Sequence, residues 1–349
     1  MRRKRNFEYL TFALLLSTMT IASWSHKANA DGGTASGSTE SQITPYDFGA
    51  VSDNGVRNEQ PALQAAINEA IDSGRPLDLC GASWRIDTPL YARGNLHIRN
   101  GQIRTSIMNN MGLDIGPAEG QEYVTPILEN LSFYKIQKTG IVGLHISRGL
   151  RVQMTNVNFH NFRNGNCVAV ALSGVQVLIW LGGKLHENDR HLAVYDYLGK
   201  RSTDIKVFGV FFQDSKSTQG HAGVSLYQAP GTSFTDCSFD VSRRAALVDV
   251  NHSWNVSFVN CRFEDSGLDE PGTHPAVYLH GGSYNIRFLA NYFNNTQKSA
   301  SSGQYPDVIH IGGATAVNLI SNSFAAASPA VTGNSDYKAI MNTNLIDNF

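Results

Sequence analysis

The stretch Phe234-Thr235-Asp236-Cys237-Ser238-Phe239 returns 24 residues later as Phe258-Val259-Asn260-Cys261-Arg262-Phe263. Both copies place two phenylalanines five residues apart, with an Asp or Asn between them that suits a tight turn. The pattern continues in both directions at intervals of 24 to 31 residues, which indicates a structural repeat. A large apolar residue holds the last position in nine copies: Ile103, Phe133, Phe159, Leu185, Phe212, Phe239, Phe263, Phe293 and Phe324.

The companions of these anchors predict how one repeat folds. Apolar residues lie seven and five positions before most anchors, so the two share one face of a short strand. The turn residue then bends the chain and the anchor faces the same interior. Stacking such coils pairs every backbone group with the coils above and below. We therefore predict an all-β chain, a single-stranded parallel β-helix of about nine to ten coils.

One segment before the repeats predicts a helix. Leu63, Ala66, Ile67, Ala70 and Ile71 form an apolar stripe with helical spacing. Asn58, Pro61 and Gly74 suit the start and the stop, so a helix is expected over about 58–74.

The start of this region resembles a known family. Tyr46-Asp47-Phe48-Gly49-Ala50 and Trp84-Arg85-Ile86-Asp87 resemble the opening of the pectate-lyase-like superfamily, in its rhamnogalacturonase and epimerase-type pectate lyase branch. The resemblance implies that the β-helix is right-handed and that the α-helix at 58–74 caps one end of it. Ala82-Ser83 and the Pro-free run Leu77–Cys80 depart from the family pattern. Because the family hosts lyases, hydrolases, epimerases and phage tailspikes, the resemblance predicts the fold more strongly than the activity.

The N-terminus predicts export. Residues 1–30 combine four early basic residues, a short apolar segment and Ala28-Asn29-Ala30, as secretory signals do. An uncleaved membrane anchor is the alternative. We expect a flexible Gly/Ser/Thr spacer over 31–42, a β-helix domain over 43–349, and a secreted or periplasmic protein.

The net charge of the chain limits the classes of partner that it can bind. Without residues 1–30 the chain keeps 23 basic and 28 acidic residues, a net charge of −5. Only 16% of all residues are charged. This balance argues against a nucleic-acid partner. No segment after the signal is long and apolar enough for an integral membrane span.

Candidate site residues lie on a third strand in each coil, before the paired apolar positions. Alternation such as Val277-Tyr278-Leu279-His280 turns every second side chain outward. Stacking the coils predicts one outward column of Asp114, His145, Ala169, a residue near Tyr195, Ser225, Asp249, Tyr278 and His310. A second column contains Tyr227, Asn251 and His280. Polar loops before these strands are expected to wall a groove, and the resemblance implies an active groove in this place.

This cluster suits β-elimination on an acidic or complex polysaccharide. The reaction needs a base, an acid for the leaving oxygen, and a cation for the substrate carboxylate. We assign His280 as the base, Tyr278 as the acid or as a base in its own right, and Arg243 or Arg244 as the cation, with Asp249 in the same site. The expected substrate-binding residues are Tyr227, Arg243, Asn251, His221, His274 and His310.

Two other functions remain open. Glycoside hydrolysis needs two carboxyls, and Asp249 with Asp214, Glu264 or Asp265 would supply them. Non-catalytic polysaccharide binding or a structural role at a surface is the third. No cofactor is required by the pattern. The acidic run Asp265–Glu270 is a candidate Ca²⁺ site, although surface turns produce such runs routinely.

The C-terminus predicts an open end. Thr343, Leu345 and Asp347 lie 26 residues after Val317, Leu319 and Ser321, so a further coil begins without a capping segment. Because an open sheet edge invites pairing, we expect a second copy or the protein itself to cover it.

Overall fold

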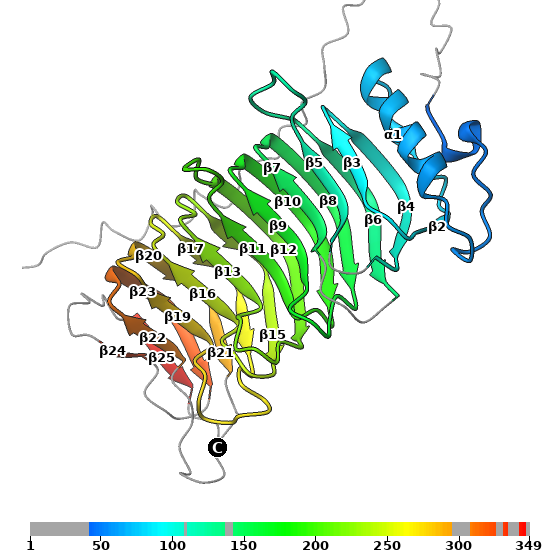
Figure 1. Ribbon diagram of the computed structural model, residues 1–349. Helices are drawn as coiled ribbons and strands as arrows, with labels where there is room; N and C mark the ends of the chain where they lie inside the picture. The colour runs from blue at the N-terminus through cyan, green and yellow to red at the C-terminus, as the bar shows by residue number, and fades with distance from the viewer. Residues whose placement is uncertain are drawn as a thin grey trace, which may run out of the picture. The chain divides into compact units, whose positions relative to one another are not determined.

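The chain winds into a parallel β-helix in which each coil stacks on the one before it (Figure 1). The computed structural model describes residues 42–107, 110–136, 142–294, 308–325, 331–333 and 342–346. The expected signal and nearly all of the expected spacer lie outside the described residues.

Among the described residues, the strands form two parallel sheets, of fifteen and ten strands. The larger sheet contains β1 (Leu77–Asp78), β2 (Ser83–Ile86), β4 (His97–Thr105), β6 (Ile127–Lys135), β8 (Leu150–His160), β10 (Gln176–His186), β12 (Thr203–Ser215), β14 (Ser233–Thr235), β15 (Ser238–Ser242), β17 (Ser257–Val259), β18 (Arg262–Glu264), β20 (Tyr284–Leu289), β21 (Tyr292–Asn294), β23 (Thr315–Ala325) and β25 (Asn342–Ile346). The smaller sheet contains β3 (Leu90–Arg93), β5 (Met111–Gly116), β7 (Val142–Ser147), β9 (Val168–Ser173), β11 (Arg190–Tyr195), β13 (Val224–Tyr227), β16 (Val248–Asn251), β19 (Val277–His280), β22 (Ile309–Gly312) and β24 (Val331–Gly333).

The predicted repeat is confirmed in each of its nine copies. All nine anchors, from Ile103 to Phe324, pair in one continuous register across the larger sheet. None is more than 3% exposed. The turn residue lies three positions before each anchor, and it has a positive φ in all nine copies, from Asn100 to Ser321. Asn, Asp and Gly dominate there because they adopt this left-handed conformation at low cost. The right-handed β-helix is therefore confirmed, with about eight turns rather than the nine to ten expected.

Aromatic rings fill the interior in columns along the stack. Phe239 and Phe263 lie 4.8 Å apart between ring centroids and are tilted by only 9°. Phe293 continues the column 4.6 Å beyond Phe263. Burying each such ring contributes about 1.5–3 kcal/mol, so the columns are a main source of stability. Cys237 and Cys261, both 2% exposed, belong to the same core.

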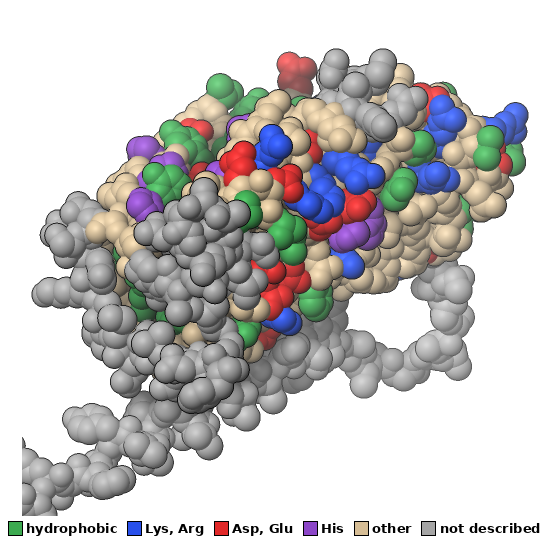
Figure 2. All heavy atoms as spheres, turned by 90° about the horizontal axis from the view of Figure 1, so that it is seen from below, with side chains coloured by type: hydrophobic (Ala, Val, Ile, Leu, Met, Phe, Trp, Pro, Cys, Tyr) green, Lys and Arg blue, Asp and Glu red, His purple; other side chains and the backbone are tan. Residues whose placement is uncertain are grey.

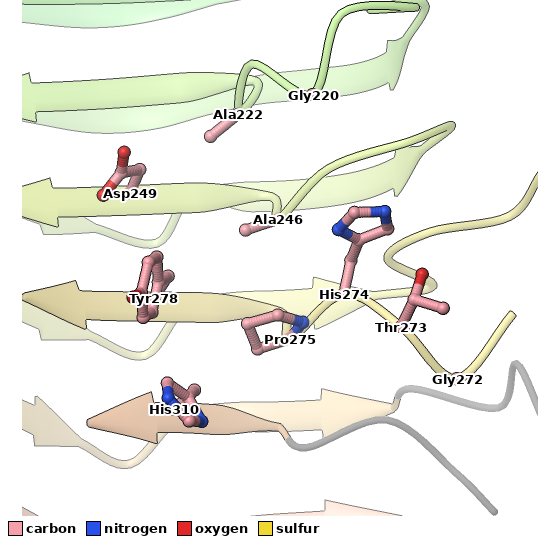
Figure 3. A pocket seen from close by; sticks show the side chains of 10 residues that line it. All are labelled: Gly220, Ala222, Ala246, Asp249, Gly272, Thr273, His274, Pro275, Tyr278 and His310. Atoms are coloured by element: carbon pink, nitrogen blue, oxygen red, sulfur yellow. The ribbon is translucent and has the colours of Figure 1, made fainter. Parts of the chain in front are cut away.

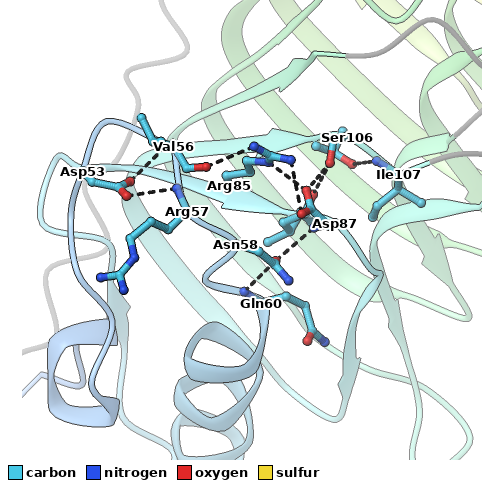
Figure 4. Close-up of polar contacts among 11 residues, drawn as sticks. Asp53, Val56, Arg57, Asn58, Gln60, Arg85, Asp87, Ser106 and Ile107 are labelled. Atoms are coloured by element: carbon cyan, nitrogen blue, oxygen red, sulfur yellow. Dashed lines mark hydrogen bonds and ion pairs between the residues drawn. The ribbon is translucent and has the colours of Figure 1, made fainter.

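The capping helix forms as predicted, with slightly narrower bounds. α1 spans Gln60–Ser73 and ends at Gly74, whose φ is 68°. Its residues Leu63, Ala66, Ile67 and Ala70 are buried. Asn58 Oδ1 accepts hydrogen bonds from the backbone N–H groups of Gln60 and Asp87, and so ties the helix start to the end of β2 (Figure 4). A 3₁₀ turn, η1 (Pro45–Phe48), precedes it.

Two further expectations concern a membrane-spanning segment and the register of the C-terminal coil. None of the helices in the described ranges is both long and apolar enough to span a bilayer.

β25 does add a strand beyond β23, but Leu345 pairs with Phe324 and not with Leu319 as expected. A count of residues along the chain cannot supply this register, because backbone pairing between the two coils sets it. Asp347 lies outside the described residues, and a covering partner at this end stays a prediction.

Candidate functional site

The outward column of the smaller sheet brings the principal candidates together. Asp249 of β16 pairs with Tyr278 of β19, which pairs with His310 of β22. Ser225 of β13 precedes them in the same register. Three chemically different side chains, about 30 residues apart in sequence, thus become neighbours at the strand spacing of about 4.8 Å.

One coil of that column was predicted in the wrong register. Asp114 pairs with His145 as predicted, but His145 pairs with Ala171 and not with Ala169. The next coil contributes Ala193, two residues before Tyr195. All six residues of β9 are buried, so no contrast of polar and apolar side chains marks its outward face. Without that contrast, a shift of two residues cannot be detected from the sequence.

A pocket of about 620 Å³ opens over the second half of the column. Asp249, Tyr278 and His310 line it from three successive strands, and His274 lines it from the loop before β19 (Figure 3). The remaining lining residues are small or compact: Gly220, Ala222, Ala246, Gly272, Thr273 and Pro275. A volume of this size is typical of ligand pockets.

His280 lies beside the pocket and contacts Asp249. Its Nε2 lies 2.7 Å from Asp249 Oδ1, and its ring stacks on Tyr278 at 4.4 Å with a 10° tilt. Burial raises the pKa of Asp249 above its ordinary value, while the charge and hydrogen bond of His280 act in the opposite direction. A carboxyl with a raised pKa is suited to proton transfer near neutral pH.

The position of the Tyr278 ring depends on a glycine of the next coil. A Cβ added to Gly312 would lie 3.0 Å from both Cε2 and the hydroxyl oxygen of Tyr278. The absence of a side chain at Gly312 therefore lets the Tyr278 ring lie over β22, close to His310, whose ring centroid is 5.3 Å away.

We expect Gly312→Ala to move the Tyr278 ring and to lower turnover about tenfold without unfolding the protein, because small displacements of a reacting group are costly. Steady-state kinetics beside a thermal denaturation curve would check this. Tyr278→Phe, which keeps the ring in place, is the control for the hydroxyl. Unchanged turnover in Gly312→Ala would contradict the assigned role of Tyr278.

Of the other predicted binding residues, His274 lines the pocket, whereas Tyr227, Asn251 and His221 lie around it. Tyr227 and Asn251 pair along the second column with His280, as predicted, but do not line the pocket. His221 lies between the lining residues Gly220 and Ala222, and burial lowers its pKa. His274 Nε2, inside the pocket, lies 2.9 Å from Glu270 Oε2.

Neither predicted arginine lines the pocket. Arg243 pairs with Asp269 at 3.2 Å and with Asp214 at 3.6 Å, and Arg244 lies 3.8 Å from Asp269 and from Glu270. Figure 2 shows a face of the molecule on which basic and acidic side chains lie next to one another, without a patch of one sign. In the described structure these arginines pair with acidic side chains of β12 and of the loop before β19.

The small residues of the pocket were not identified from the sequence. Ala222, Ala246 and Pro275 each stand two positions before the first residue of β13, β16 and β19. A compact residue repeated at this place leaves room above the column. This repeated position is the signal that would have located the pocket.

One group of side chains has the spacing of metal ligands. Donor atoms of His186, Glu187 and Asp214 lie within 4.8 Å of one another. Lys216 and Arg243 already pair with Asp214, and Arg163 lies 3.5 Å from Glu187. Because these basic side chains already pair with the two carboxylates and would repel a metal ion, the group is poorly suited to bind one. In the run Asp265–Glu270, Asp269 and Glu270 likewise face Arg243 and Arg244.

The fold defines a class, the right-handed parallel β-helix proteins, and the pocket of this chain lies on the outside of the smaller sheet. No protein-family model matches the sequence, and no curated protein matches it either.

Several solved structures have a fold similar to that of this chain. ORF18 of Geobacillus virus E2 superposes with a TM-score of 0.57 at 16% identity, over 81% of this chain and 61% of its own. The gp42 tailspike of Acinetobacter phage vb_AbaP_AS12 gives 0.59 at 16% identity, over 82% and 52%. The Streptococcus pneumoniae surface protein and adhesin PfbA gives 0.55 at 13% identity, over 87% and 98%. The chain thus spans little more than half the length of the two phage proteins, and the likeness shows a shared fold.

Proposed function

We propose that this protein is an exported enzyme that cleaves an acidic polysaccharide by β-elimination in the pocket formed by Asp249, Tyr278 and His310. The pairing of a half-buried carboxyl of raised pKa with a tyrosine and imidazoles in one pocket carries this proposal. The β-helix fold it shares with phage tailspikes and a surface adhesin supports an extracellular role. The resemblance at Tyr46–Leu90 to the pectate-lyase-like superfamily supports the same substrate class.

The reaction follows from which groups reach the pocket. Asp249, held by His280, takes the proton from the carbon next to the uronate carboxyl. The electron pair forms the new carbon–carbon double bond, and the bond to the glycosidic oxygen breaks. Tyr278 donates its hydroxyl proton to that leaving oxygen. His280 does not line the pocket, so we assign it a positioning role in place of the base.

The substrate carboxylate needs a positive partner. Since Arg243 and Arg244 do not line the pocket, we assign this role to the imidazoles of His274 and His310, which do. A protonated imidazole stabilises the charge that develops as the proton leaves.

Hydrolysis is supported less well than elimination. It needs two carboxyls about 5–9.5 Å apart. Among the described lining residues, Asp249 is the only carboxylate. Asp214 is paired with Lys216, and Glu264 with Arg262.

A substrate panel separates the three functions. The full chain is incubated with uronate-containing and neutral polysaccharides, and products are followed by ultraviolet absorbance and by reducing ends. Elimination leaves an unsaturated sugar that absorbs, whereas hydrolysis produces reducing ends alone. Binding without either product would contradict enzymatic function and favour a non-catalytic role.

The pH profile tests the role of Asp249. Because the base must be ionised, kcat/KM is expected to rise with pH through a limb that lies above the ordinary aspartate pKa of about 3.9. His280 lowers the pKa of Asp249, so His280→Gln should move this limb to higher pH. A limb that stays in place or moves to lower pH would show that another group controls it.

A further inference from the structure

A second cluster with the chemistry of a sugar site lies at the start of the larger sheet's strands. Trp254 precedes β17, and Tyr284 is the first residue of β20. Their rings lie 5.8 Å apart between centroids and are parallel within 1°. The guanidinium of Arg201 lies over Trp254, 4.8 Å from its centroid. These contacts hold the two rings in a fixed orientation.

The stack ends with an exposed ring. On the next coil the residue paired with Tyr284 is Thr315, followed by Ala316, so among the described residues no aromatic side chain continues the stack. Tyr284 is 46% exposed. An aromatic ring that is rigidly held and uncovered provides a flat apolar surface, which matches the C–H face of a pyranose ring.

A polar hollow adjoins the stack. It has a volume of about 220 Å³ and begins at the residues directly after the two rings, Asn255 and Asn285. Ser257 and Arg287, paired across β17 and β20, complete its polar lining. Asn285 Nδ2 donates to Asn255 Oδ1 at 2.6 Å, which fixes both amides. None of these lining residues is acidic.

Arg287 supplies a positive group for an anion. It is exposed, and it forms no ion pair with another side chain in the described part of the chain. The planar guanidinium binds a carboxylate through two parallel hydrogen bonds. Amides and a hydroxyl beside it suit the hydroxyl groups of a sugar.

We infer that Tyr284, Asn255, Asn285 and Arg287 form a second binding site for a uronate unit of a polysaccharide. The ring of the sugar stacks on Tyr284 and its carboxylate pairs with Arg287. This site lies on the larger sheet, whereas the candidate pocket lies on the smaller one. A polymer long enough to occupy both binds more tightly than a short oligomer, because the second contact becomes intramolecular. The choice of ligand rests on the proposed function.

Binding is measured by titration calorimetry with polygalacturonate and alginate, using the full chain carrying Asp249→Asn to prevent cleavage. Tyr284→Ala and Arg287→Ala are each expected to raise Kd about tenfold, as loss of a main contact does. Tyr284→Phe keeps the ring and should keep the affinity. Neutral dextran is the control polymer, and thermal denaturation checks that each variant is folded.

The outcomes separate this inference from the proposed function. Unchanged Kd in Tyr284→Ala, or a loss confined to Arg287→Ala, would overturn the site, since stacking would then play no part. Absence of binding to either uronate polymer would overturn it as well. Cleavage by the chain with Asp249 intact is scored separately by absorbance. A Tyr284-dependent affinity without cleavage leaves the second site standing and removes only the elimination activity.

Discussion

Asp249→Asn is expected to lower kcat on a uronate polymer by about 10²- to 10⁴-fold, the usual contribution of a general base. The amide cannot accept the substrate proton, although it keeps the shape of the carboxyl. Stability should change little, because Asn can still hydrogen-bond to His280, which lies 2.7 Å from Asp249. Turnover and the midpoint of thermal unfolding are the two measurements.

The same sheet supplies a matched control. Asp114 and His145 form a similar pair at 2.8 Å in β5 and β7, outside the candidate pocket. Burial acts to raise the pKa of Asp114, but hydrogen bonds from His145 and Arg93 outweigh it and lower the pKa. Asp114→Asn should therefore cost stability and leave kcat unchanged. Equal losses of activity in the two variants would mean that Asp249 acts only through the fold.

Phe263→Ala is expected to cost about 3–5 kcal/mol of unfolding free energy, the usual range for a buried phenylalanine. Phe263 is fully buried and stacks between Phe239 and Phe293 at 4.8 and 4.6 Å. Its removal leaves a cavity that interrupts the column between two coils. Urea denaturation followed by circular dichroism measures the loss.

Phe211→Ala is the control for this prediction. Phe211 belongs to the same larger sheet but is 50% exposed and faces outward from β12. Its removal should change the unfolding free energy by no more than about 0.5 kcal/mol. A similar loss in both variants would contradict the conclusion that the inner columns stabilise the fold.

The candidate site was partly predictable. Tyr278, Asp249 and His310 alternate with core residues on strands of clear period two, so their neighbourhood follows from stacking. Arg243 and Arg244 belong to a loop, where no periodicity tells whether a side chain turns toward the pocket or toward Asp269. His280 was placed correctly near Asp249, but its absence from the pocket lining was not predicted.

By itself the sequence determined the β-helix, its inward anchors and its left-handed turn positions, because each of these depends on spacing within one coil or between adjacent coils. Tertiary structure alone decided the register at β9 and β25, the shape of the pocket and the partners of its charged neighbours. Those features depend on where loops from different coils come to rest and on which side chains then meet. Local preferences of the chain do not encode such distances.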